Sequence, residues 1–194
     1  IVVDAEDREN EGDFICAAED ATPEAINFMI THGRGQVCMS VLPDVARRLE
    51  LPRMVESNST PLGTAFTIPV DHVSARTGIT AAERAVAVAA ILNPESSPQD
   101  FVRPGHLFPL IAKEGGILRR AGHTEATIDL ARLAGKEPTG VLCEILDTDG
   151  NRADRNALRA LAKKHGLEII SIEELIRYRR TKEKLVERVA EADL

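Results

Sequence analysis

The chain has 194 residues, 43% of them hydrophobic and 28% charged, a balance typical of one compact globular domain and unlike that of disordered segments. A formal net charge of −7 and an aromatic content of 3%, with no tryptophan, argue against a nucleic-acid-binding surface. Three widely spaced cysteines fit neither a disulfide framework nor a zinc cluster, and no apolar run is long enough for a membrane helix, so we expect a cytoplasmic protein that handles a small molecule.

Six short apolar segments are predicted to be strands, because each is bounded by glycine, proline or charged residues. They comprise residues 1–3, 13–18, 36–41, 65–70, 140–145 and 168–171. Since the chain opens on the first of them without a methionine, we expect further residues before Ile1.

Helices are indicated between these strands by their end signals. A helix is expected to start at Thr22-Pro23, and capping boxes begin one over residues 81–92 and another after Ser171. Gly135 and Gly166 are expected to end helices over 124–134 and 154–165. The alternation predicts an α/β sheet covered by helices, with the segments 52–63 and 93–122 as irregular loops.

The last segment, residues 172–194, has its apolar positions on one stripe at helical spacing. Two interpretations remain open. The segment is either a surface helix packed on a domain formed by residues 1–171, or a connector that leads to a second domain.

The segment 4–13, with the sequence DAEDRENEGD, gathers six carboxylates around Arg8. Crowded carboxylates repel one another unless a cation neutralises them, so a hard metal ion is one explanation. A solvated acidic loop is the other.

Two further segments, residues 104–110 and 119–126, each place a histidine directly after a glycine. In the second, Arg120 precedes Gly122-His123-Thr124 at the expected start of a helix, where free N–H groups can bind an anion. A phosphate between Arg120 and these N–H groups is one interpretation. The alternative is that Thr124 merely caps the helix.

Glu144 interrupts an apolar strand, where a buried carboxylate is costly unless it is paired or protonated. It is therefore a candidate general acid or base, unless the strand lies at a sheet edge and Glu144 faces solvent. Cys38 follows a glycine-containing loop; it either faces a site or packs as a small hydrophobe.

Seven motifs carry a resemblance to a known family, and they occur in the order DAEDRENEGD, GRGQVC, TAFTIPVD, TGITAAERA, RPGHLFPL, GGILRRAGHTEATIDLARLAG and VLCEI. From Val2 to about Tyr178 the chain resembles 3,4-dihydroxy-2-butanone 4-phosphate synthases. The resemblance implies a three-layer α/β domain with a mixed twisted sheet. It also implies a homodimeric, magnesium-dependent lyase of riboflavin biosynthesis, with manganese as an alternative ion and active sites near the dimer interface. Its reaction converts D-ribulose 5-phosphate to 3,4-dihydroxy-2-butanone 4-phosphate and formate.

The family pattern also implies roles for individual residues. Glu9 and His123 match its metal ligands, and His106 and Glu144 match positions needed for catalysis. The residues expected to contact the phosphosugar are Arg8, Glu9, Asp13, Arg120, Ala121, Gly122, His123, Thr124 and Glu144. The chain departs from the pattern at Ala5, where the family has an aspartate, and at Glu83. The tail resembles the connector of bifunctional proteins in which GTP cyclohydrolase II follows.

Overall fold

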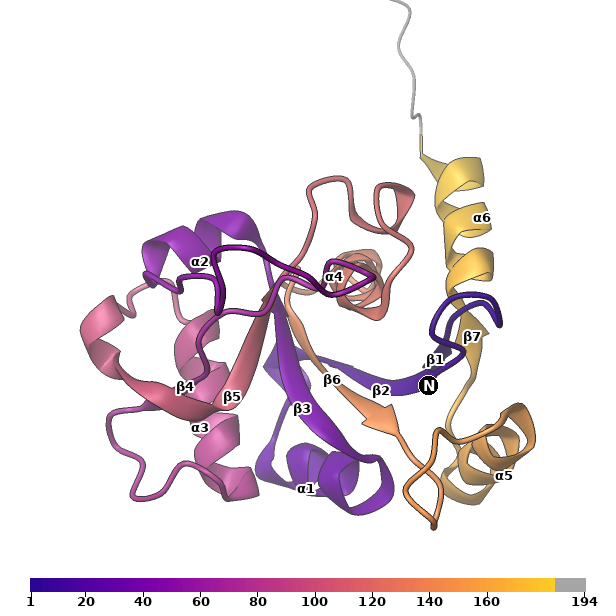
Figure 1. Ribbon diagram of the computed structural model, residues 1–194, viewed down its shortest axis with the longest axis horizontal. Helices are drawn as coiled ribbons and strands as arrows, with labels where there is room; N and C mark the ends of the chain where they lie inside the picture. Colours follow the sequence, from indigo (N-terminus) through magenta and orange to yellow (C-terminus); the bar gives the residue numbers. More distant parts are fainter. Residues whose placement is uncertain (184–194) are drawn as a thin grey trace, which may run out of the picture.

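The computed structural model describes residues 1–183, and within them one open, mixed sheet forms the centre of the molecule (Figure 1). Seven strands take part in the order β4-β5-β3-β6-β2-β1-β7. The neighbours β3 and β5, and β1 and β7, run parallel, and the other pairs run antiparallel. The strands are β1 Val2–Val3, β2 Gly12–Ala17, β3 Arg34–Val41, β4 Val70–His72, β5 Phe101–Ile111, β6 Gly140–Ile145 and β7 Ile170–Ser171.

The described part of the chain has six α-helices, five between strands and the last after β7: α1 Pro23–His32, α2 Pro43–Arg48, α3 Ala81–Leu92, α4 His123–Leu133, α5 Arg155–His165 and α6 Ile172–Lys182. The helix starts predicted after Thr22, Thr80 and Ser171 are confirmed. The Thr22 hydroxyl accepts a hydrogen bond from the Ala25 N–H, and capping boxes begin α3 and α6. None of these helices combines the length and hydropathy that crossing a bilayer requires.

The helices cover the sheet on two sides, which confirms the three-layer α/β prediction (Figure 1). Helices α1, α3 and α5 pack on one side, over a core that includes Ile26, Met39 and Leu158. Helix α4 packs on the other side with α6 beside it, over a smaller cluster that includes Ala126 and Leu175. On this second side the strands β3, β5 and β6 carry Cys38, Leu110 and Leu142 as a separate apolar cluster.

Two sequence predictions are wrong in the middle of the chain. Within residues 65–70, Phe66 and Thr67 form only isolated bridges, and Val70 alone belongs to a strand, β4. Conversely, β5 occupies part of the segment 93–122 that we expected to be a loop, so His106 lies in a strand. Pro104, Gly105 and Pro109 are local turn signals, but pairing with β3 and β4 on both sides overrides them.

The start of α4 also differs from the prediction. Gly122 is the N-cap, with no side-chain capping bond, and Thr124 is the second helical residue. Thr124 therefore does not cap the helix, and the backbone N–H groups at the helix start have no intrahelical acceptor.

Helix α6 packs on the domain through a buried ion pair as well as apolar contacts. Arg179 Nη1 lies 2.8 Å from Asp129 Oδ2 on α4 and 3.1 Å from the Gly115 carbonyl oxygen. Asp129 is 1% exposed. The expected apolar positions Leu185, Val186 and Val189 lie outside the described residues, so the connector hypothesis stays a prediction.

We expect Arg179→Ala to lower the free energy of unfolding by about 3 kcal/mol, because it leaves the Asp129 carboxylate buried without its main partner. Arg177→Ala is the matched control, since Arg177 pairs with Glu173 on the exposed face of the same helix and should contribute below about 0.5 kcal/mol. Chemical denaturation of the two variants measures the difference. Equal losses in the free energy of unfolding for the two variants would show that the Arg179–Asp129 ion pair does not stabilise the packing of α6.

Candidate active site

The acidic loop that follows β1 is folded around the side chain of Asp4. Asp4 is 2% exposed, and its carboxylate accepts hydrogen bonds from the backbone N–H groups of Glu9 (3.0 Å) and Glu11 (2.8 Å). Arg8 Nη1 adds an ion pair at 2.7 Å and also contacts Glu9. The loop is therefore an ordered structure around the buried carboxylate of Asp4, while Glu6 and Asp7 remain exposed to solvent.

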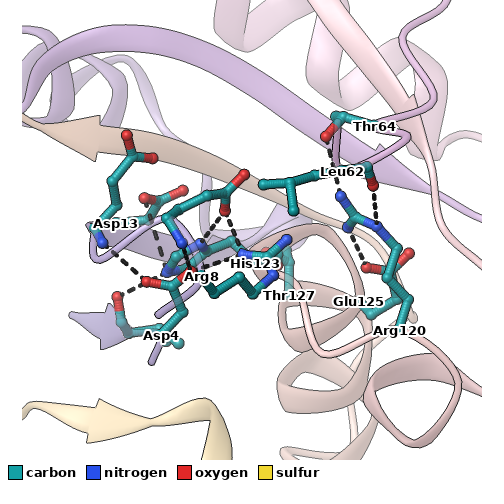
Figure 2. Close-up of polar contacts among 12 residues, drawn as sticks. Asp4, Arg8, Asp13, Leu62, Thr64, Arg120, His123, Glu125 and Thr127 are labelled. Atoms are coloured by element: carbon teal, nitrogen blue, oxygen red, sulfur yellow. Dashed lines mark hydrogen bonds and ion pairs between the residues drawn. The ribbon is translucent and has the colours of Figure 1, made fainter. Parts of the chain in front are cut away.

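Helix α4 brings His123 against this loop (Figure 2). The Nδ1 atom of His123 lies 3.6 Å from Glu9 Oε2, and its Nε2 atom lies 3.2 Å from the Val2 carbonyl oxygen and 3.9 Å from Asp13 Oδ1. One potential ligand atom from each of Asp4, Glu9 and His123 lies within 4.8 Å of the others. Sequence reasoning paired Glu9 with His123 but missed Asp4, whose signal was its position directly after a buried strand.

The electrostatics of this cluster follow from burial and opposite charge. Burial alone would lower the pKa of His123, but Asp13, Glu9 and Asp4 together raise it to about 9. Burial raises the pKa of Asp13 to about 7, and its Oδ1 atom has no hydrogen-bond partner. The nearby His123 ring and the charge of Arg8 lower the pKa of Glu9. The carboxylates of Asp4 and Glu9, the imidazole of His123 and the unpartnered Oδ1 atom of Asp13 form a donor set that suits a divalent cation.

A narrow cavity of about 140 Å³ opens beside this cluster. Its lining residues come from the acidic loop, the sheet and the start of α4: Arg8, Glu9, Glu11, Asp13, Gln36, Cys38, Thr64, Phe66, Leu110, Arg120, His123, Thr124, Leu142 and Glu144. A larger hollow of about 830 Å³ beside α2 contains none of these groups. The cavity thus joins charged groups to an apolar floor made by Cys38, Leu110 and Leu142. Burial raises the pKa of the Cys38 thiol well above its usual range.

Glu144 reaches the cavity from a strand in the middle of the sheet. Strand β6 lies between β2 and β3, so the alternative of an edge-strand glutamate is wrong. The β3–β6 register shifts between Arg34 and Val37, and this bulge directs the Gln36 N–H to Glu144 Oε2 at 2.8 Å. Gly35 provides the space, since a Cβ there would lie 2.7 Å from the same oxygen.

Two arginines flank the start of α4. A Cβ on Gly122 would lie 2.2 Å from Arg120 Nη1 and 2.9 Å from Arg8 Nη2, so both guanidinium groups lie against this glycine. Arg120 is already engaged. Its side chain donates to Glu125 (2.7 Å), to the Leu62 carbonyl (3.3 Å) and to the Thr64 hydroxyl (3.0 Å), as Figure 2 shows. Arg120 therefore adds positive charge to the cavity and also holds the 62–64 loop beside it through the hydrogen bonds to Leu62 and Thr64.

Most of the residues singled out by the sequence line this cavity, and three do not: Ala121, Gly122 and His106. Ala121 lines a neighbouring hollow with Asp4 and Arg8. His106 lies in β5 with its side chain 42% exposed, paired with Asp71, and does not line the cavity of its own chain.

Comparison with known proteins assigns this arrangement to a family. The family model for 3,4-dihydroxy-2-butanone 4-phosphate synthase matches residues 1–178. The riboflavin biosynthesis protein RibBA of Bacillus mycoides (strain KBAB4) is 57% identical over all 194 residues, and that of Bacillus subtilis (strain 168) is 54% identical. The chain spans about half of these relatives, 49% of the length of each.

Solved structures agree with this assignment. The two-domain 3,4-dihydroxy-2-butanone 4-phosphate synthase RibBX from A. baumannii superposes with a TM-score of 0.94 at 49% identity, over 98% of this chain and 56% of that one. A 3,4-dihydroxy-2-butanone 4-phosphate synthase in complex with two magnesium ions gives a TM-score of 0.87 at 41% identity, over 93% of this chain and 90% of the other.

We expect Arg120→Ala to release the 62–64 loop and to lower the free energy of unfolding by about 3 kcal/mol, because Glu125 is buried and loses its ion partner. Limited proteolysis should then cut within residues 56–64 faster than in the unsubstituted protein. Arg119→Ala, a change at the exposed neighbouring arginine, is the control and should leave the cleavage rate unchanged. Equal protection of the loop in both variants would contradict the fastening role.

Proposed function

The chain belongs to the 3,4-dihydroxy-2-butanone 4-phosphate synthase family, an enzyme family of riboflavin biosynthesis, and from this premise we propose that it converts D-ribulose 5-phosphate to 3,4-dihydroxy-2-butanone 4-phosphate and formate. One observation carries the proposal most directly. A cluster suited to a cation, an arginine-flanked helix start suited to a phosphate, and the carboxylate of Glu144 all adjoin one cavity.

Glu9 and His123 would hold a Mg²⁺ ion, with Mn²⁺ as the alternative, and Asp4 lies close enough to join them. Carboxylate oxygens suit both ions, and the imidazole nitrogen favours manganese more than magnesium. When bound, the cation stabilises negative charge that develops on the carbonyl and hydroxyl oxygens of the ketose.

Arg8 and Arg120, together with the N–H groups at the start of α4, would bind the substrate phosphate. Helix N-termini carry partial positive charge, and guanidinium groups donate two parallel hydrogen bonds to phosphate oxygens. Ala121, Gly122 and Thr124 would contribute backbone groups to this contact. The phosphate anchors the sugar while its reacting carbons lie towards Glu144 and Asp13.

The reaction needs proton removal beside the carbonyl, then dehydration, migration of a carbon and loss of formate, and each step moves protons. Glu144 suits this task because the Gln36 N–H holds one carboxylate oxygen and leaves the other for substrate. His106 is the second proton-transfer residue that we propose.

We further propose a cytoplasmic homodimer in which the cavity lies near the subunit interface. Phe66 and Phe108 are only partly buried beside the cavity floor, and Met54, Val55 and Leu62 on the adjoining loop are 43%, 51% and 39% exposed. A second subunit would cover these apolar side chains. Residues 172–194 would then connect this domain to the additional length of the relatives.

Glu9→Gln and His123→Ala should each abolish formate release from ribulose 5-phosphate, because each removes one proposed ligand while the loop and α4 keep their other contacts. A chelator should do the same to the unsubstituted protein, and added Mg²⁺ should restore activity. Glu19→Gln, at an exposed glutamate outside the cavity, is the control. Formate release without any divalent ion would contradict the metal site, and phosphosugar turnover without formate would indicate an isomerase or aldolase.

Glu144→Gln should lower kcat by roughly two to four orders of magnitude, the range usual for loss of a proton-transfer group. Glutamine keeps an oxygen to accept the Gln36 N–H, so the melting temperature should change little. Measuring both quantities on one variant is decisive, because marked destabilisation with normal turnover would make Glu144 a structural residue.

The dimer proposal predicts complementation between inactive variants. His106→Ala and Glu9→Gln should each be inactive alone, and co-expressed in equal amounts should recover roughly a quarter of the unsubstituted activity. We expect this fraction if each site uses Glu9 from one subunit and His106 from the other. Random pairing makes half of the dimers mixed, and in a mixed dimer one site carries both substitutions while the other carries neither. Recovery of no activity would show that His106 serves its own chain.

A further inference from the structure

Two arginines of one distant segment hold the backbone of the acidic loop from outside. Arg152 Nη1 donates a hydrogen bond to the Glu9 carbonyl oxygen, and Arg155 Nη2 donates one to the Asp4 carbonyl oxygen. Arg152 lies in the turn after β6, and Arg155 is the first residue of α5. These contacts span 143 and 151 positions of the chain, so they exist only because the fold brings the two segments together.

The Arg152 contact fixes the peptide bond that follows Glu9. The next residue, Asn10, has a φ of +54°, in the left-handed region. Two other hydrogen bonds of this backbone stay within the loop: the Glu9 N–H donates to Asp4 Oδ2 at 3.0 Å, and the Asn10 N–H donates to the Ala5 carbonyl oxygen at 3.3 Å. Arg152 therefore ties the turn of the loop to the rest of the domain.

Both arginines bind carbonyl oxygens although the loop offers six carboxylates. The Glu9 carboxylate has other neighbours, since its Oε2 atom contacts Arg8 and lies 3.6 Å from His123 Nδ1. A contact to the Glu9 carbonyl orients the residue without using its carboxylate oxygens, which are the atoms that would bind a cation. The position of Arg152 thus suits a residue that holds a ligand in place.

The turn that carries Arg152 is itself fixed to the sheet. Arg34 Nη1, at the start of β3, donates to the Asp147 carbonyl oxygen at 2.7 Å. Leu146 and Arg152 pair in an antiparallel bridge across the turn. Strand β6, directly before the turn, carries Glu144. One continuous segment therefore presents a carboxylate to the cavity and an arginine to the acidic loop.

We propose that Arg152 is a positioning residue for the metal site, which holds the Glu9 peptide so that the Glu9 carboxylate faces His123 before a cation binds. The inference rests on the proposed function, because it takes Glu9 as a ligand of the cation. Two effects of Arg152 on cation affinity have opposite signs. Its positive charge repels a cation, whereas its hold on Glu9 favours binding by fixing a ligand in advance.

The test is Arg152→Met, which removes both the hydrogen-bond donor and the charge. Binding of Mn²⁺ to the protein without substrate is measured by electron paramagnetic resonance. We expect the Kd for Mn²⁺ to rise roughly tenfold to a hundredfold, the usual range for residues that orient a metal ligand. Arg152→Lys, which keeps the charge and a donor, should restore most of the affinity. The free energy of unfolding should change little in both variants, because Arg152 is exposed.

Arg159→Met is the matched control, because Arg159 is an exposed arginine on the next turn of α5 and its loss removes the same charge. Its Kd for Mn²⁺ should stay unchanged or fall slightly. Unchanged or tighter Mn²⁺ binding by Arg152→Met would overturn the positioning role, since loss of positive charge alone gives that result. Equal weakening in Arg159→Met would also overturn it.

Hydrogen exchange gives a second measurement that needs no variant. In the chelator-treated, unsubstituted protein, the backbone N–H groups of Glu9 and Asn10 should be protected, because the proposal has the loop closed before a cation binds. Free exchange of both groups would overturn the proposal, even if Arg152→Met does not fold. Failure of the unsubstituted protein to bind Mn²⁺ and to release formate would instead refute the proposed function.

Discussion

The buried carboxylate of Asp4 is the interaction on which the candidate active site depends. It gathers two backbone N–H groups and the Arg8 guanidinium of the acidic loop. A loop with six carboxylates would otherwise spread apart, because like charges repel. Once the loop is closed, Glu9 is held beside His123 at the start of α4, although 114 positions separate the two in the chain. The charge balance of this cluster leaves a place suited to one cation.

The two faces of the sheet differ in how far helices cover them. One face packs against α1, α3 and α5 and provides most of the buried apolar residues. The other face is only partly covered, because α4 lies over one part of it and leaves the cavity beside it. Glu144 and Asp13 pair across β6 and β2 on this face, so the sheet itself holds two carboxylates close together at the cavity.

Two irregularities in strand pairing direct polar groups out of an otherwise regular sheet. The bulge at residues 34–37 turns a backbone N–H towards Glu144, and the bulge in β5 turns His106 towards solvent beside Asp71. Both depend on a glycine at the point of closest approach, Gly35 in one and Gly105 in the other. Irregular pairing leaves some backbone groups without a partner in the strand ladder. In each bulge a side-chain carboxylate accepts a hydrogen bond from such a backbone N–H: Glu144 from Gln36, and Asp71 from His106.

The sequence by itself determined the features that short-range chemistry encodes. The capping residues Thr80 and Ser171 mark the starts of α3 and α6, and the acidic loop and the glycine-histidine motifs indicated most of the candidate site. Only the tertiary structure decided that β5 is a strand despite Pro104 and Gly105, and that Arg120 is bound to Glu125 and the 62–64 loop. It also decided that Asp4 lies within 4.8 Å of potential ligand atoms of Glu9 and His123. These features depend on pairing register and on contacts between distant segments, which no local pattern of residues specifies.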